Sequence, residues 1–308
     1  MARNFIIGID LGGTNLKAAL LDTRYRIIRK ESLSTRDFSD KESLINAIAG
    51  CVNKLIKENK LKKGNVFGVG LGLPGPINAR QGLVHFFPNI PGWKDIRLKK
   101  ILEKKIKLPV FLDNDANLMS LAEHSIGAAK GFRNVVCLTL GTGVGGGLIV
   151  EGKLYRGSSY AAGEIGHIPV NEDGPRCNCG GKACLETYIG NKRIIEQARR
   201  SFKRDISLED LSQLANSGNK KAKAIWSKVG QSLGVALAGI VNLLNPDCVV
   251  IGGGVANAGR VLFDQVKDTI SKRAMGVPAK QVKIFKAKLG DDAGLIGAAI
   301  LVKENLSS

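Results

Sequence analysis

Residues 6–14 read IIGIDLGGT, and residues 135–143 repeat the same pattern as VVCLTLGTG. The two stretches align without a gap, and the alignment continues as far as Leu21 over Val150. Each copy is an apolar strand, a turn of glycine and threonine, and a second apolar strand, which predicts a β-hairpin. Because many hairpins share this pattern, the repeat favours duplication of a unit but leaves coincidence open.

Strands and helices alternate along the remainder of the chain. Further strands are expected over residues 26–33, 66–71, 109–112, 248–251 and 282–287. Apolar residues at helical spacing predict helical segments over residues 41–60, 96–107, 116–128, 191–244, 261–273 and 293–303. This alternation predicts an α/β fold with largely buried sheets. Two such units would place a ligand in the cleft between them.

Composition is that of an ordinary globular protein. The 308 residues suggest about two domains, and 44% apolar with 24% charged residues argues against a disordered or collagen-like chain. No apolar run approaches the roughly 20 residues that span a bilayer. The N-terminus leaves no room for a signal peptide. We therefore expect a cytoplasmic protein with no membrane partner.

The formal net charge of +19 indicates no specific partner. Lysines are spread through helical segments such as 54–63 and 99–107, which favours solvated helix faces over a nucleic-acid patch. Aromatic residues are only 5% and are not interleaved with the charges, so base-stacking platforms are not expected.

Three glycine-rich turns each follow a predicted strand, at residues 12–14, 141–147 and 252–254. Glycine lets backbone N–H groups approach an anion closely. A single turn of this kind is typical of a tight hairpin, but three of them favour a bound nucleotide. Neither the P-loop nor the dinucleotide fingerprint is present, so a different architecture would hold the nucleotide.

Two aspartates stand at the ends of predicted strands. Asp10 lies beside the first glycine turn, where its carboxylate could hold Mg²⁺ or stabilise the turn. Asp115 follows Asn114 at a strand-to-helix junction, where aspartate is a preferred N-cap. The alternative is a base that accepts a hydroxyl proton, with Asn114 fixing the substrate by hydrogen bonds. Spacing leaves both alternatives open, and Asp113 is expected to be structural.

The insertion after the second hairpin carries the most specific signal. It supplies one imidazole and three thiols from His167, Cys177, Cys179 and Cys184. This Cys₃His set suits a structural Zn²⁺ site, and unligated thiols in a surface loop would be open to oxidation. Such a metal would also position Glu164 and Glu186, whose carboxylates accept hydrogen bonds from vicinal hydroxyls. The pattern therefore indicates a polyol ligand.

Together these motifs resemble the ROK family of sugar kinases and sugar-responsive repressors. The likeness covers nearly the whole chain. Residues 9–17 resemble the family's first phosphate motif, residues 140–147 its second and residues 251–254 its adenosine-side motif, and the stretch from Glu164 to Glu186 matches the family signature. One departure is Ala183, where the family usually has glycine, which would alter the path of the loop slightly.

The resemblance implies a duplicated actin-like, ribonuclease H-like ATPase fold with two domains around a cleft. We expect a smaller domain of residues 1–115 plus 292–308 and a larger domain of residues 116–291 that contains the zinc-binding insertion. By family likeness the protein is expected to form a homodimer.

The resemblance also implies a role for each matching residue. Asp115 would be the catalytic base. Sugar would be bound by Asn114, Asp115, Glu164, His167 and Glu186, with Gly75 and Asn89 lining the same pocket. ATP and Mg²⁺ would be held by Asp10, Gly12, Gly13, Thr14, Lys17, Gly141, Thr142, Gly143, Gly253 and Gly254. Zn²⁺ would be held by His167, Cys177, Cys179 and Cys184.

These residues predict an ATP-dependent kinase that phosphorylates the 6-hydroxyl of a hexose, with glucose favoured. Fructose, mannose, N-acetylmannosamine and N-acetylglucosamine are alternative substrates, because sequence does not determine which hydroxyl stereochemistry is recognised. A non-catalytic sugar-responsive regulator is the alternative from another class. Family repressors carry an N-terminal helix-turn-helix, for which the phosphate strand beginning at Phe5 leaves no room. No nucleic-acid partner is therefore expected.

Overall fold

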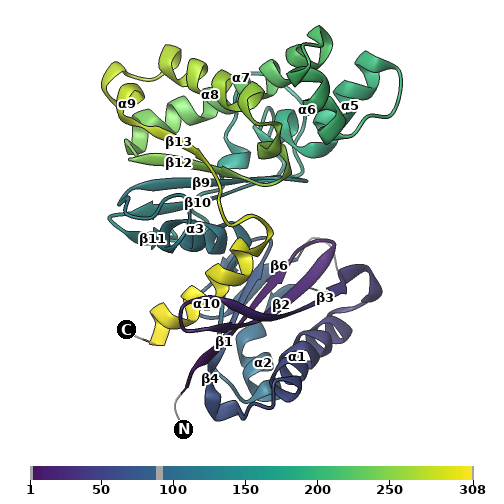
Figure 1. Ribbon diagram of the computed structural model, residues 1–308, viewed down its shortest axis with the longest axis vertical. Helices are drawn as coiled ribbons and strands as arrows, with labels where there is room; N and C mark the ends of the chain where they lie inside the picture. The colour runs from purple at the N-terminus through teal and green to yellow at the C-terminus, as the bar shows by residue number, and fades with distance from the viewer. Residues whose placement is uncertain (1–2, 88–92, 307–308) are drawn as a thin grey trace. The chain divides into compact units, whose positions relative to one another are not determined.

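The computed structural model describes residues 3–87 and 93–306, which fall into two compact units. Unit 1 takes the described residues up to Ala122, residues 156–162 and those from Asp291 onward (Figure 1). Unit 2 consists of Glu123–Tyr155 and Gly163–Gly290. The division differs from the expected ranges by one residue at Asp291, where unit 1 resumes, and at two further places. The chain leaves unit 1 within a helix rather than at residue 115, and it returns to unit 1 over residues 156–162.

Unit 1 is built on a five-stranded sheet with the order β3-β2-β1-β4-β8. The strands are β1 (Phe5–Leu11), β2 (Asn15–Asp22), β3 (Ile27–Ser34), β4 (Val66–Leu73) and β8 (Val110–Asn114). The expected hairpin is confirmed, because β1 pairs antiparallel with β2 and places Asp10 opposite Lys17. On its other side β1 pairs parallel with β4, which pairs parallel with β8.

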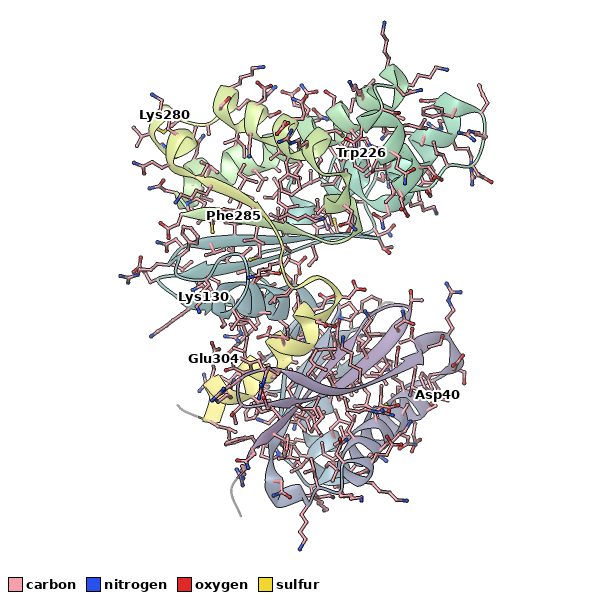
Figure 2. The ribbon with its side chains drawn as sticks, in the orientation of Figure 1. Asp40, Lys130, Trp226, Lys280, Phe285 and Glu304 are labelled. Atoms are coloured by element: carbon pink, nitrogen blue, oxygen red, sulfur yellow. The ribbon has the colours of Figure 1, made fainter. Side chains whose placement is uncertain are left out.

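Helices cover the sheet of unit 1. They are α1 (Lys41–Glu58), α2 (Leu98–Ile106) and α10 (Ala293–Leu306). Helix α3 (Asp115–Ser125) follows β8, begins in unit 1 and ends in unit 2. Alternate residues of β1, namely Ile7, Ile9 and Leu11, belong to the same apolar cluster as α1 and α2, while α10 packs on β1 and β4. Asp40, labelled in Figure 2, is the N-cap of α1, and its carboxylate accepts hydrogen bonds from the backbone N–H groups of residues 42 and 43.

A three-stranded sheet in unit 1 was not predicted. It consists of β5 (Ile77–Asn78), β6 (Leu83–Phe86) and β7 (Lys94–Ile96). Each strand has only two to four residues, too few to show the alternation by which a strand is recognised in sequence.

Unit 2 repeats the sheet of unit 1, with the order β11-β10-β9-β12-β13. Its strands are β9 (Val135–Leu140), β10 (Val144–Val150), β11 (Lys153–Tyr155), β12 (Cys248–Gly252) and β13 (Lys283–Lys286). As in unit 1, the first strand pairs antiparallel with the second and parallel with the fourth, which pairs parallel with the fifth. The same order and directions in both sheets confirm the expected duplication and the α/β fold class.

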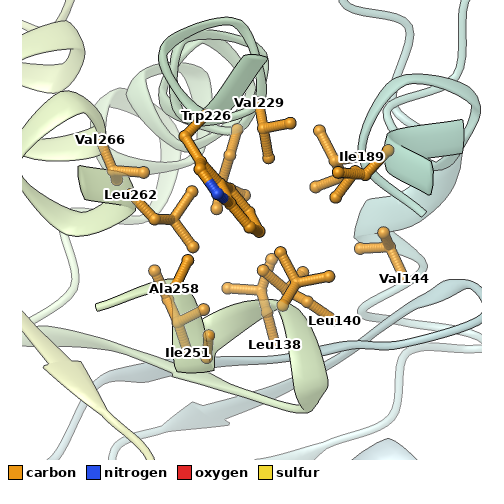
Figure 3. Packing of buried hydrophobic residues seen from close by; sticks show 14 of the residues in the cluster. Leu138, Leu140, Val144, Ile189, Trp226, Val229, Ile251, Ala258, Leu262 and Val266 are labelled. Atoms are coloured by element: carbon orange, nitrogen blue, oxygen red, sulfur yellow. The ribbon is translucent and has the colours of Figure 1, made fainter. Parts of the chain in front are cut away.

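The helices of unit 2 include one that carries a buried tryptophan in the core. They are α4 (Glu186–Ile189), α5 (Asn191–Phe202), α6 (Leu208–Asn216), α7 (Lys220–Leu244), α8 (Arg260–Arg273) and α9 (Gly276–Gln281). Trp226 of α7 is fully buried. Figure 3 shows it among Leu138 and Leu140 of β9, Ile251 of β12 and Leu262 of α8. The sheet and both long helices therefore share one core.

Helix α7 is long and apolar enough to cross a membrane by length and composition alone. However, 61% of its most apolar window is buried inside the protein. A core helix of a globular protein has the same length and apolar character. The buried residues of α7, among them Trp226, Leu233 and Leu237, account for its apolar composition.

Glu123 of α3 is a fully buried carboxylate. Its Oε1 atom accepts hydrogen bonds from the backbone N–H groups of Lys288 (2.9 Å) and Leu289 (2.8 Å), and its Oε2 atom accepts one from Ala128 (2.7 Å). The carboxylate thus fastens two parts of unit 2 that lie beside the points where the chain passes between units, at residues 122–123 and 290–291.

Replacing Glu123 by alanine should lower the free energy of unfolding by about 3 kcal/mol, because three hydrogen bonds to a buried carboxylate are lost at about 1 kcal/mol each. Glu123→Gln should cost less, since its amide oxygen can still accept from Lys288 and Leu289. Urea unfolding measures both. An unchanged transition midpoint for Glu123→Ala would show that the carboxylate does not hold these segments.

Candidate functional site

Polar residues of unit 1 meet where its parallel strands end. Asp10 of β1 lies opposite Gly72 of β4, which lies opposite Asp113 of β8. Since neighbouring strands are about 4.8 Å apart, this row places the backbones of Asp10 and Asp113 within about 10 Å of each other. Gly75 and Asp115 follow directly on the ends of β4 and β8. One edge of the sheet therefore gathers the predicted metal-binding and catalytic aspartates.

The start of α3 shows which residue caps the helix. The Oδ1 atom of Asn114 accepts hydrogen bonds from the backbone N–H groups of Ala116 (2.9 Å) and Asn117 (3.4 Å), and its Nδ2 atom donates to the carbonyl of Gly75 (3.2 Å). Asp115 is the first residue of α3, and its carboxylate also accepts from Ala116 (2.8 Å). Because Asn114 bonds the N–H groups that an N-cap serves, capping alone does not explain an aspartate at position 115.

Asp113 is structural, as expected. Its side chain is only 2% exposed, and its Oδ1 atom accepts from the N–H of Asn114 and from Nδ2 of Asn117, both at 2.8 Å. Its Oδ2 atom accepts from the guanidinium of Arg156. No sequence signal pointed to Arg156, which lies 43 residues along the chain.

The environment of Asp10 fits a bound cation. Burial raises the pKa of its carboxyl group, the ammonium of Lys17 opposes the rise, and the charge of Asp291 adds to it. Within residues 3–87 and 93–306 no hydrogen-bond donor to this carboxylate is found. A side chain on Gly294, at the start of α10, would collide with it. A divalent cation would supply the missing positive partner.

The first glycine turn leaves backbone donors available. The hydroxyl of Thr35 donates to the carbonyl of Gly13, and its backbone N–H donates to the carbonyl of Thr14, both at 2.9 Å. In the described part of the chain, the N–H groups of Gly13 and Thr14 have no acceptor. They can therefore bond an anion such as a phosphate. Thr35 was missed because it lies some twenty residues from the turn.

In unit 2 the second and third turns also lie at the ends of neighbouring strands, β9 and β12. At two of the predicted nucleotide-binding positions, the protein itself requires glycine. A Cβ atom on Gly143 would collide with the carboxylate of Glu186, which accepts the N–H of Val144 at 3.1 Å. Gly253 has φ +84°, and a Cβ there would collide with the carbonyl of Leu140. Packing within the protein therefore explains the glycines at positions 143 and 253, and these glycines do not by themselves indicate a bound nucleotide.

Asn191 joins these turns and was not predicted. Its N–H donates to the carbonyl of Gly141 at 2.9 Å, and its Nδ2 atom lies near Gly254. Its Oδ1 atom is buried and has no hydrogen-bond partner within residues 3–87 and 93–306. An unpaired buried acceptor between two candidate nucleotide turns is suited to a donor on a ligand.

The four predicted metal ligands come together. One ligand atom from each of His167, Cys177, Cys179 and Cys184 lies within 4.8 Å of the others. The Sγ atoms of Cys179 and Cys184 are 3.7 Å apart, and Sγ of Cys177 is 3.6 Å from Nδ1 of His167. Zinc bond lengths predict tetrahedral edges of about 3.8 Å between sulfurs and about 3.5 Å between sulfur and nitrogen. The cluster therefore fits a tetrahedral metal ion.

The thiols differ in acidity. The N–H of Gly181 lowers the pKa of Cys179 to about 7, whereas burial raises the pKa of Cys184 to about 12. A metal that binds both as thiolates must displace a proton at least from Cys184.

The two candidate sugar carboxylates border the cluster. The Oε2 atom of Glu164 is 3.8 Å from Nε2 of His167, and Oε1 of Glu186 is 3.9 Å from Sγ of Cys177. With Nδ1 of His167 toward the metal, Nε2 is left to face a ligand. The predicted sugar residues are divided between Gly75, Asn114 and Asp115 in unit 1 and the other three in unit 2. Asn89 lies outside the described residues.

Ala183, where this chain departs from the family pattern, adopts a backbone conformation that suits glycine. Its φ is +55°, in the left-handed region that favours glycine. Its N–H donates to the carbonyl of Pro175 at 3.0 Å, and its carbonyl accepts from Val170 at 2.9 Å. These bonds hold the strained alanine in place, and the metal ligands remain together around it.

Comparison with known families matches the ROK family over residues 6–305. This chain belongs to the ROK family. A glucokinase from Halalkalibacterium halodurans is 36% identical to it, over 100% of this chain and 98% of that protein.

Solved structures of ROK proteins share its fold. A ROK hexokinase from Thermus thermophilus has a TM-score of 0.83 at 32% identity, covering 98% of this chain and 99% of that one. A ROK family glucokinase from Streptomyces griseus, solved with glucose and AMPPNP, also has a TM-score of 0.83, at 30% identity over 97% and 99% of the two chains.

The Ala183→Gly variant should be as stable as the native protein or up to about 1.5 kcal/mol more stable. It removes a left-handed alanine worth about 1–2 kcal/mol of strain but gains about 0.4–1 kcal/mol of unfolded-state freedom. Thermal unfolding with equal metal content measures this. A loss of more than about 1 kcal/mol would mean that packing of the alanine methyl group outweighs the strain.

Proposed function

We propose that this ROK protein transfers the γ-phosphoryl group of ATP to the 6-hydroxyl of a hexose, with glucose as the preferred sugar. The observation that carries the proposal is the row at the edge of the unit 1 sheet, where Asp10 and the first glycine turn follow β1 and Asp115 follows β8, with only β4 between these two strands. A phosphate site next to a carboxylate base is what phosphoryl transfer to an alcohol requires. The similarity to glucokinases favours glucose.

In this mechanism the carboxylate of Asp115 accepts the proton of the sugar hydroxyl as the hydroxyl oxygen attacks the γ-phosphorus of ATP. The bond from that phosphorus to the bridging oxygen of the β-phosphate breaks, and ADP leaves. The free N–H groups of Gly13 and Thr14, with the ammonium of Lys17, would stabilise negative charge on the phosphates. Asp10 would hold Mg²⁺, which supplies further charge neutralisation when bound. Most of the acceleration would come from positioning and electrostatics.

Unit 2 would supply the remaining contacts. Glu164, Glu186 and Nε2 of His167 can bond sugar hydroxyls as acceptors or donors. The turn at Gly141–Gly143 would hold phosphates of the nucleotide, and the turn at Gly253–Gly254, together with Asn191, would hold its adenosine side. The metal of the Cys₃His cluster would be Zn²⁺, with a structural role, because four protein ligands fill its coordination sphere.

A panel of hexoses with ATP in a coupled ADP-release assay tests the function. The expected result is the highest kcat/KM for glucose. Preference for fructose, mannose or an N-acetylated aminosugar would change the substrate, and sugar binding without ADP release would favour the non-catalytic regulator. The homodimer and the cytoplasmic location stay predictions.

Asp115→Asn should lower kcat at least about 100-fold, because a general base contributes about 10²–10⁴-fold, while the sugar still binds. Steady-state kinetics and calorimetric titration with glucose measure the two effects. Asp95→Asn, at an exposed aspartate of unit 1 that pairs with His85, serves as the control and should leave kcat unchanged. Undiminished turnover in Asp115→Asn would remove the base assignment.

Cys179→Ser should reduce bound zinc from one ion per chain and weaken glucose binding about 10-fold, because the metal holds the loop of Glu164 and Glu186. Elemental analysis and glucose titration measure both. Asn178→Ser, at an exposed neighbour that is not a ligand, should change neither. Normal glucose affinity in a verified zinc-free sample would contradict the coupling.

A further inference from the structure

Residues 156–162 form a short return of the chain into unit 1. They follow β11 of unit 2 and precede Gly163 and Glu164, which again belong to unit 2. The N–H of Ala162 donates to the carbonyl of Arg156 at 3.0 Å, so the segment closes on itself. Its first residue, Arg156, therefore lies at the closed end of a loop that is followed within two residues by Glu164, a candidate sugar-binding carboxylate.

The side chain of Arg156 attaches this loop to the end of β8. Its Nε and Nη2 atoms lie 2.8 and 2.7 Å from Oδ2 of Asp113. The arginine side chain is 25% exposed and the aspartate 2%. In the described part of unit 1, Arg156 is the one cation within ion-pair distance of Asp113. Without it, Asp113 would be a buried carboxylate with no compensating charge.

Asp113 in turn holds the beginning of α3. Its other oxygen accepts from the N–H of Asn114 and from Nδ2 of Asn117. Among the described residues, the side-chain oxygen of Asn117 is buried without a hydrogen-bond partner, so the bond to Asp113 is what fixes that amide. Asp115 lies between these two residues on the same turn. Contacts of 2.7–2.8 Å thus link Arg156 through Asp113 to Asn114 and Asn117, which lie before and after the proposed base in the sequence.

We propose that Arg156 is a positioning residue for phosphoryl transfer, which holds the first turn of α3, and with it the carboxylate of Asp115, through its ion pair with Asp113. The inference rests on the proposed kinase function. It assigns Arg156 no contact with either substrate.

The first test is Arg156→Met, which keeps an unbranched apolar stem and removes the charged guanidinium group. It should lower kcat about 10- to 100-fold, the effect of a small misplacement of a reacting group, with KM for ATP and sugar within about three-fold of the native values. Arg156→Lys should restore part of kcat. Arg80→Met is the matched control, because Arg80 lines the same pocket of unit 1 as Arg156, together with Tyr160 and Glu304. It should leave kcat unchanged.

The double variant Asp113→Asn with Arg156→Met separates positioning from direct binding. An amide at position 113 keeps an acceptor for Asn114 and Asn117 but needs no counter-charge, so adding Arg156→Met to Asp113→Asn should change kcat less than three-fold. This variant also keeps the test open if Arg156→Met alone fails to fold. An equal loss of kcat in both backgrounds, or a raised KM as the main effect, would overturn the proposal in favour of ligand contact.

Amide hydrogen exchange of residues 114–118 provides a readout that does not depend on activity. Arg156→Met should speed exchange there, and the double variant should restore the protection of Asp113→Asn. If the native protein phosphorylates no sugar, the proposed function fails while the exchange result still decides whether Arg156 holds the turn. Unchanged exchange in Arg156→Met would overturn its positioning role.

Discussion

Parallel pairing of the central strands is the constraint on which both units depend. Parallel strands end at the same edge of a sheet, so the loops that follow them meet there however far apart they lie in the sequence. In unit 1 this brings the end of β1, with Asp10, to the ends of β4 and β8, with Gly75 and Asp115. In unit 2 it brings together the turns after β9 and β12. Duplication of one topology therefore produces two candidate sites from one arrangement.

Buried carboxylates hold the loops at these edges. Glu123 accepts three backbone N–H groups, and Asp113 accepts two N–H donors and an arginine. A buried charge is costly unless it is paired or hydrogen-bonded, and each of these carboxylates meets that condition by connecting distant segments. Because an unpaired buried carboxylate costs free energy, the arrangement of segments that provides its hydrogen-bond donors is favoured over other arrangements.

Residues with two uses connect the metal cluster to the glycine turns. Glu186 begins α4, lies near Cys177 and bonds the N–H of Val144, and its approach leaves no room for a side chain on Gly143. Order in the metal-binding loop is thereby transmitted to the β9–β10 hairpin. The metal-binding loop also accommodates an alanine in the left-handed conformation at position 183, while the four candidate metal ligands remain close together.

Sequence by itself determined the features that rest on short-range patterns. Strand and helix periodicity, the duplicated hairpins and the cluster from His167 to Cys184 all arise from residues close together in the chain, where local geometry limits the outcome. The tertiary structure decided the partners of those residues. Arg156 with Asp113, Glu123 with Lys288, and Asn191 with Gly141 are separated by dozens of residues or more, and no local period encodes such pairs. It also decided that Asn114 caps α3, because two adjacent polar residues are equally suited to that role until the backbone path selects one.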